Sequence, residues 1–205
     1  MTEQAPAPTS LRQRRQQQTR ADLVAAVLAV IGEDGVAGAT IDQVSAASGI
    51  SRGTVYAYFP GGRDELLRAA YAQLGHDLVA RTRAALSVES GWEGQLSALA
   101  QAMFELASDE RVGHFYNVSG PALISVGDER GIGSGASVEM IRDAFELAAA
   151  RGDVESDIDA EVIALLLVGA LREAATEVAA GALDPDRAVR AFARLARGLA
   201  GARAA

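Results

Sequence analysis

The segment Thr40–Leu67, TIDQVSAASGISRGTVYAYFPGGRDELL, decides the fold of the N-terminal part of this chain. Thr40 and Gln43 have the spacing of a capping box, which predicts that a helix begins here. Gly49 permits the left-handed backbone of a sharp turn. We expect Ser51 to cap a second helix, which the following Pro-Gly-Gly ends. Two short helices joined by such a turn form a helix-turn-helix.

The second of these helices carries more polar side chains than a structural helix needs. Val55 and Phe59 are four residues apart and are predicted to face the core. Arginine can donate two hydrogen bonds to guanine, and threonine contacts thymine methyl groups or base edges. Tyrosine hydroxyls donate hydrogen bonds to phosphate oxygens. Taken alone, the pattern favours DNA only modestly, because helical corners occur in many folds. The candidate DNA-contacting residues of this helix are Arg52, Gly53, Thr54, Tyr56 and Tyr58.

The run T-I-x-x-V-S-x-x-S-G-I-S-R-G-T-V-Y-x-Y-F-P-x-x-R-D-E-L resembles the TetR/AcrR family of bacterial transcriptional regulators, over residues 20–71. Ser45 and Ser48 stand where that family usually has alanine. Arg63 stands where it commonly has lysine and keeps the positive charge of a phosphate contact. The resemblance thus adds Thr40, Ser51 and Arg63 to the candidate DNA-contacting residues. The resemblance implies a repressor that binds a palindromic double-stranded DNA operator as a homodimer and that a small-molecule effector releases.

Composition and charge are compatible with this interpretation. The chain of 205 residues has no cysteine, which excludes disulfides and thiolate metal sites. Its net charge is −8, yet residues 1–71 hold seven arginines against seven acidic residues. The whole negative excess lies in residues 72–205, and DNA binding needs only a local basic face.

The chain is predicted to fold as an all-α protein of about nine helices. Residues 1–18 are expected to be disordered or a basic arm that folds on DNA; a frayed, solvated helix start is the alternative. Residues 19–64 form the DNA-binding domain, whose first helix is capped by Thr19 and ended by Gly35. Residues 65–205 form a helical domain for ligand binding and dimerisation.

Residues 108–137 are expected to be irregular. Gly131–Ala136 fits G-x-G-x-x-A, and Ala122–Val126 would pass for the strand before a dinucleotide-binding loop. That fold needs repeated βαβ units, and the sequence has no others, so a flexible loop is favoured.

The last two helices are candidates for a dimer interface. A helix that starts at Asp157 or Asp159 is apolar nearly all round, so it must be buried on more than one side. Asp184 and Pro185 then open a final amphipathic helix. A monomer leaves no partner for the second apolar face, whereas two copies form a four-helix interface. The interface candidates are Leu166, Ala170, Val189, Phe192, Leu195 and Leu199.

The resemblance also implies a ligand pocket in the C-terminal domain. For each apolar candidate the alternative is ordinary core packing. His114 either forms a hydrogen bond with the ligand or is an exposed loop residue. The candidates, chosen by residue type and helix face, are Met103, Phe104, His114, Phe115, Tyr116, Asn117, Met140, Phe145 and Arg172.

Two rival classes are an enzyme and a helical adaptor that binds only protein. The two histidines, His76 and His114, lack metal-ligand spacing, and no catalytic residues, metal or cofactor are expected. The longest apolar run, Val162–Leu171, is about half a membrane span. Residues 1–22 lack the apolar core of a signal peptide, so no membrane association and a cytoplasmic location are expected.

Overall fold

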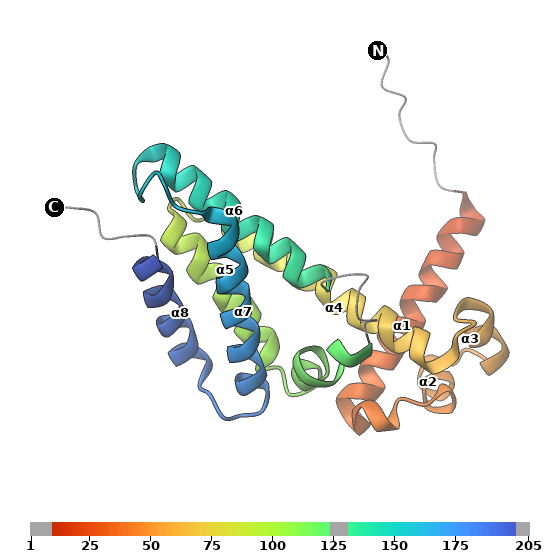
Figure 1. The fold of residues 1–205 in the computed structure, drawn as a ribbon. Helices are drawn as coiled ribbons and strands as arrows, with labels where there is room; N and C mark the ends of the chain where they lie inside the picture. The colour runs from red at the N-terminus through yellow and green to blue at the C-terminus, as the bar shows by residue number, and fades with distance from the viewer. Residues whose placement is uncertain (1–9, 124–130, 200–205) are drawn as a thin grey trace, which may run out of the picture. The chain divides into compact units, whose positions relative to one another are not determined.

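The structure, a computed structural model, describes residues 10–123 and 131–199, and the regular elements within these ranges are all helices. The chain divides into two compact units, residues 1–70 and residues 71–205. The division falls inside helix α4, Gly62–Leu86. The predicted all-α fold, with a helix-turn-helix ahead of a larger helical body, is confirmed (Figure 1).

The first helix begins earlier than the sequence suggested. Helix α1, Leu11–Gly38, starts at a complete capping box, in which the Gln13 amide donates to Ser10 Oγ at 3.2 Å. The Ser10 amide in turn donates to Gln13 Oε1 at 2.8 Å. The prediction that Thr19 caps the helix is wrong, because its hydroxyl donates back to the Arg15 carbonyl inside the helix. The start of α1 is solvent-exposed, and residues 1–9 of the expected arm lie outside the described residues.

Local signals set the other helices of the first unit. Helix α1 kinks at Gly35, where the backbone has φ 71°. Helices α2 and α3 begin as predicted, since Thr40 Oγ1 accepts from the Gln43 amide and Ser51 Oγ from the Thr54 amide. α2 spans Ile41–Ser48 and α3 spans Arg52–Tyr58. These helices enclose a small apolar core, whose largest fully buried side chains are Leu23, Val27, Val44, Val55, Phe59, Leu66 and Leu67.

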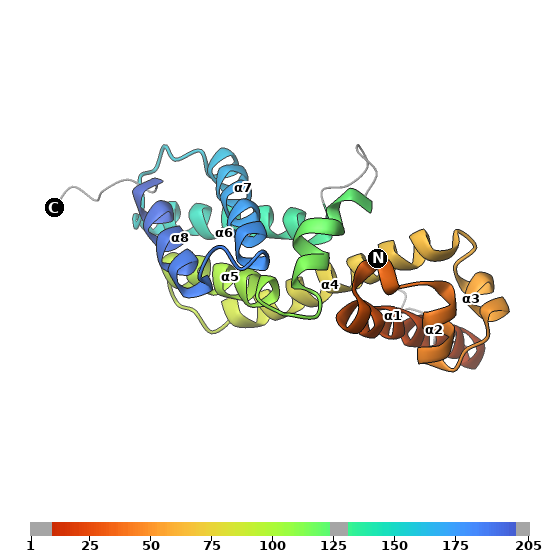
Figure 2. The same cartoon turned by 90° about the horizontal axis from the view of Figure 1, so that it is seen from below.

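The second unit has its own core between helices α5 to α8, and Leu86 at the end of α4 packs against it. α5 packs on α6, α7 and α8, and α7 packs on α6 and α8, as both views show (Figures 1 and 2). Phe104, Phe145 and Leu167 are completely or almost completely buried there. Asp159 caps α7, and Asp184 with Pro185 opens α8, as predicted. The helices are α5 Trp92–Ala107, α6 Ile132–Arg151, α7 Ala160–Ala179 and α8 Pro185–Leu199, with a π-helical turn at Phe115–Ser119 and a 3-10 turn at Pro121–Leu123.

The glycine-rich run after residue 130 is helical, so the expected irregular segment does not reach 137. α6 begins at Ile132 and includes Gly133 and Gly135. A Cβ on Gly133 would collide with the Tyr116 hydroxyl, whereas one on Gly135 would meet nothing within 4 Å. The glycine at 133 therefore serves close packing. The strand considered for a dinucleotide-binding fold was Ala122–Val126. Its first two residues belong to a 3-10 turn, Pro121–Leu123, and residues 124–130 lie outside the described residues.

We expect Gly133→Ala to lower the free energy of unfolding by about 1–3 kcal/mol, because the added methyl group forces Tyr116 or α6 to shift. Gly135→Ala, at an open position of the same helix, should instead raise it by up to about 1 kcal/mol, since alanine favours helix. Urea denaturation followed by circular dichroism measures both changes. Equal effects of the two substitutions would contradict the packing role of Gly133.

Candidate nucleic-acid interface and cavity

Helix α3 is held to the first unit from one side. Its apolar residues Val55 and Phe59 are fully buried, as predicted. Gly49 ends α2 in a left-handed conformation, with φ 69° and ψ 8°, and so allows the sharp turn between the helices. Ile50, between the turn and Ser51, is half-buried. The helix-turn-helix therefore presents one fixed face of α3 to solvent.

The solvent face of α3 collects the polar groups that the sequence singled out. Arg52, Gly53 and Tyr56 are exposed, and Thr54 and Tyr58 are half-buried. Tyr56 remains 52% exposed despite its size. A Cβ on Gly53 would lie no nearer than 3.9 Å to Ser51 Oγ, so a partner's backbone or phosphate can approach here closely. These side chains can offer hydrogen bonds to a nucleic acid, while Thr40 and Ser51 already cap helices.

Arg52 is held over the start of α3 by an ion pair with helix α2. Its Nη1 donates to Asp42 Oδ1 at 2.9 Å, and both side chains remain largely exposed. Exposed ion pairs of this kind contribute little stability, about 0–1 kcal/mol. The pair therefore orients the guanidinium but adds little to the free energy of unfolding. Because the pair is weak, an incoming ligand can displace Asp42 from Arg52.

Arg20 has a role that the sequence did not indicate. Its guanidinium lies over the Phe59 ring, 4.2 Å from the ring centroid, and its Nη1 donates to the Tyr58 carbonyl at 3.0 Å. A cation at the C-terminal end of α3 also interacts favourably with the helix dipole. Arg20 thereby ties α3 to α1 across 38 positions of sequence, and no local pattern signals a contact over that separation.

Arg63 differs from its expected role as a phosphate contact. Its Nε donates to the Ala39 carbonyl at 2.9 Å and its Nη2 to the Val36 carbonyl at 2.5 Å. These carbonyls lie at the end of α1, where the last carbonyls of a helix lack i+4 amide partners; Val36 O also accepts from the Ala39 amide at 3.2 Å. The guanidinium thus mainly caps the C-terminal end of α1. Its remaining nitrogen, Nη1, makes no hydrogen bond to these carbonyls and lies 3.9 Å from Asp64 Oδ1.

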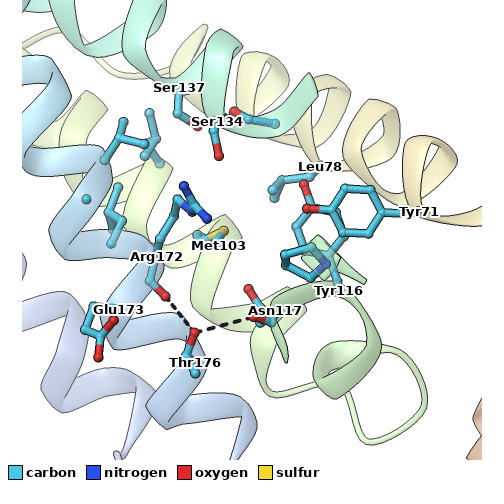
Figure 3. Close-up of a pocket in the computed structure, with 16 residues that line it drawn as sticks. Tyr71, Leu78, Met103, Tyr116, Asn117, Ser134, Ser137, Arg172, Glu173 and Thr176 are labelled. Carbon is cyan, nitrogen blue, oxygen red and sulfur yellow. Dashed lines mark hydrogen bonds between the residues drawn. The ribbon is translucent and has the colours of Figure 1, made fainter. Parts of the chain in front are cut away.

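The second unit contains a cavity of about 290 Å³ between α4, α5, α6, α7 and the π-helical turn (Figure 3). One side carries the Arg172 guanidinium, and another carries the hydroxyls of Tyr71 and Tyr116. Apolar side chains cover the remaining wall. The lining residues are Tyr71, Leu78, Leu99, Met103, Tyr116, Asn117, Pro121, Gly133, Ser134, Ser137, Val168, Gly169, Leu171, Arg172, Glu173 and Thr176.

The two tyrosines of this cavity form a stacked pair. The rings of Tyr71 and Tyr116 lie 4.8 Å apart at an interplanar angle of 18°, and the edge of Phe115 supports Tyr71. Burial raises the pKa of both phenols, and the nearby Arg172 guanidinium opposes this shift. The hydroxyls therefore stay protonated at neutral pH and can donate hydrogen bonds into the cavity.

The structure brings together four of the nine candidate pocket residues: Met103, Tyr116, Asn117 and Arg172 line this cavity. Phe104, Phe115 and Phe145 are buried in packing contacts instead, and Met140 packs against the core. His114 is exposed. Selection by residue type missed Tyr71 and the small polar residues Ser134, Ser137 and Thr176. Tyr71 follows Leu67 by four positions and precedes Leu74 by three on α4, and this helical spacing was the available signal.

The candidate interface residues lie differently on α7 and α8. Leu166 and Leu195 are 60% and 44% exposed, and Val162 is 47% exposed on the same helix as Leu166. Ala170 and Val189 are half-buried. Phe192 is 95% buried in the core of the unit but also lines a groove of about 390 Å³ with Ala170 and Leu195. The side chain of Leu199 lies outside the described residues.

Comparison with known proteins identifies the family. The model for "Bacterial regulatory proteins, tetR family" matches residues 23–70, and the model for "Tetracyclin repressor-like, C-terminal domain" matches residues 92–201. This chain belongs to the TetR family. The first match covers the helix-turn-helix, and the second covers most of the unit that contains the cavity.

Individual relatives of this TetR-family protein agree with the match. The transcriptional regulator SrpR of Pseudomonas putida is 34% identical over 87 residues, which are 42% of this chain and 40% of SrpR. The chain thus aligns with less than half the length of that relative. A TetR-family regulator from Pectobacterium atrosepticum has a similar fold, with a TM-score of 0.73 and 24% identity, covering 91% of this chain and 94% of that one. The regulator FadR from Bacillus subtilis, solved with stearoyl-CoA, gives a TM-score of 0.70 at 15% identity, covering 86% and 96%.

The TetR family consists of transcriptional regulators. Within the described residues of this member, no group of three or more histidine and acidic side chains is placed to hold a metal ion. No helix in the same residues is long and apolar enough to cross a membrane.

We expect Arg63→Ala to lower the free energy of unfolding by about 1–2 kcal/mol, because two carbonyls at the end of α1 lose their charged donor. Arg52→Ala, which removes an exposed ion pair, should change it by less than about 0.5 kcal/mol. Urea denaturation of the two variants measures the difference. An Arg63 variant as stable as the parent would show that this arginine is free for another role.

Proposed function

We propose that this chain is a DNA-binding transcriptional repressor whose affinity for its operator depends on a small molecule bound in the cavity of residues 71–205. The observation that carries the proposal is the solvent face of α3. Arg52, Gly53, Thr54 and Tyr56 lie together there, while Val55, Phe59 and Arg20 hold the helix from behind. A rigid helix with an exposed polar face is what reading a major groove requires.

Within this proposal the residues have different tasks. Arg52 and Thr54 contact base edges, Tyr56 and Tyr58 contact phosphates, and Gly53 lets the backbone approach the DNA. The capping residues Thr40 and Ser51 reach the phosphates at the starts of α2 and α3, where helix dipoles favour anions. Arg63 contributes by holding α1, and not as a direct phosphate contact.

A homodimer supplies the second reading helix. A single α3 spans seven residues and covers only a few base pairs, whereas two copies reach successive major grooves about 34–36 Å apart on a palindromic site. The exposed apolar side chains of Val162, Leu166 and Leu195 on α7 and α8 supply an apolar face for the partner. The negative charge of residues 72–205 repels the DNA phosphates and so limits the non-specific affinity for DNA.

Ligand response is proposed to act through α4. Tyr71 and Leu78 of α4 line the cavity, and the same continuous helix begins at Gly62, beside the end of α3. A ligand that favours one position of α4 therefore shifts the population of DNA-binding forms. FadR from Bacillus subtilis, a structural relative, was solved with a bound small molecule, which supports a ligand in this fold.

The assignment of α3 predicts distinct effects of single substitutions on DNA binding. Arg52→Ala or Thr54→Ala should relax the sequence preference, at about 1–3 kcal/mol for each lost base contact. Tyr56→Phe should weaken binding evenly across sequences, because it removes only a phosphate contact. Selection of bound genomic fragments gives the operator, and fluorescence anisotropy compares operator with random DNA. The proposed roles are excluded if all three variants lose affinity equally for both DNAs.

The assignment of α7 and α8 predicts the oligomeric state. Leu166→Glu should shift the protein from dimer to monomer, because it places a charge in the proposed apolar interface. Val88→Glu, at a position that is 80% exposed and lies outside α7 and α8, is the matched control and should leave the dimer intact. Sedimentation velocity at micromolar concentration distinguishes the two states. A monomeric parent protein would rule out this interface.

A further inference from the structure

We propose that the cavity of residues 71–205 binds a small carboxylate with a compact apolar body, such as an aromatic carboxylic acid, through Arg172 and the hydroxyls of Tyr71 and Tyr116. The inference rests on the proposed function, because it names the chemical class of the effector. The size of the cavity, its donors and its apolar wall each support it.

The size of the cavity limits the ligand to a small molecule. Its volume of about 290 Å³ is at the lower end of the range for ligand pockets. At the roughly 30 Å³ that a water molecule occupies in the liquid, it holds about ten non-hydrogen atoms. A single ring with a carboxylate fits this space, and a long acyl chain or a nucleotide does not.

Hydrogen-bond donors dominate the polar part of the lining. Arg172 is the cation of the wall, and no carboxylate of the described residues lies within ion-pair distance of it. Asn117 uses one amide hydrogen on the Gly113 carbonyl and keeps the other, and Ser134 adds a hydroxyl. A planar guanidinium pairs best with a carboxylate, which accepts two parallel hydrogen bonds.

Tyr116 provides the second, independent indication of a ligand. The residue is 95% buried, and its hydroxyl, the polar end of the side chain, lies at the wall of the cavity (Figure 3). The hydroxyl lies in a notch between Gly75 and Gly133, where added Cβ atoms would contact or collide with it. This hydroxyl and that of the neighbouring Tyr71 can therefore both donate to a ligand oxygen in the cavity.

The rest of the wall suits a compact apolar group. Leu78, Leu99, Met103, Val168 and Leu171 line the space beside the donors. Glu173 is the one acidic residue of the described lining, and its carboxylate points away from the space that the Arg172 guanidinium faces (Figure 3). The charged end of the ligand therefore meets a donor-rich, positively charged region, and its body meets hydrocarbon.

Matched ligands test the charge preference directly. Isothermal titration calorimetry of the full chain measures binding of benzoate, phenylacetate and cyclohexanecarboxylate. The neutral amides of these acids and the cation benzylamine have the same apolar bodies and serve as controls. We expect at least one carboxylate to bind about tenfold or more tightly than its amide, because the amide lacks the charge that Arg172 pairs with. Benzylamine should not bind measurably.

Variants then connect the preference to named residues. Arg172→Gln should abolish the difference in affinity between each carboxylate and its amide. Arg172→Lys should keep part of that difference, since lysine keeps the positive charge but cannot donate two parallel hydrogen bonds. Tyr116→Phe should weaken carboxylate binding about five- to tenfold by loss of one donor. Arg81→Gln, at an exposed arginine of α4 outside the cavity, is the control and should behave like the parent.

Three results would overturn the inference: no carboxylate of the panel binds at millimolar concentration, an amide or benzylamine binds as tightly, or Arg172→Gln keeps the preference. DNA binding of the parent protein without any carboxylate is measured separately. A protein that binds benzoate but no DNA would defeat the proposed function and leave this site standing. A protein that binds its operator but no carboxylate would do the reverse.

Discussion

The burial of Phe59 beneath Arg20 is the interaction on which the arrangement of the first unit depends. α3 has only seven residues, and a helix of that length is not stable by itself in water. It exists because Val55 and Phe59 are buried and because Arg20 stacks on the Phe59 ring and donates a hydrogen bond to the Tyr58 carbonyl. All of these contacts lie on one side. The opposite side is therefore fixed in direction and free in space, which is the condition for a reading surface.

A comparable constraint shapes the second unit. The backbones of α4 and α6 approach closely at Gly75 and Gly133, where a Cβ on Gly75 would lie 3.5 Å from the Gly133 nitrogen. The Tyr116 hydroxyl lies beside both glycines, and Tyr116 and Gly133 line the cavity. Gly75 and Gly133 thus have a packing role, and the G-x-G-x-x-A pattern around Gly133 belongs to the start of helix α6 and not to a dinucleotide-binding loop.

Much of the fold was predictable because short-range chemistry determines it. Capping residues at Thr40, Ser51 and Asp159 mark helix starts that the structure reproduces, and Gly49 marks the turn. The start of α1 was missed although Ser10 and Gln13 carry the same capping signal, since the polar run that follows lacks an apolar stripe. The start of α6 was missed because its glycines are poor helix formers, and tertiary packing overrides that preference.

The sequence by itself determined the helical class of the protein, the helix-turn-helix and the set of polar residues on its second helix, because capping, turns and periodicity act within a few positions. Only the tertiary structure decided what the arginines do. Arg20 and Arg63 bind carbonyls that are 38 and 24 or more positions away, and Arg172 faces the hydroxyl of Tyr116 across a cavity. An arginine side chain is long and finds its partner wherever the packed chain leaves an acceptor, and that location depends on how all the helices pack.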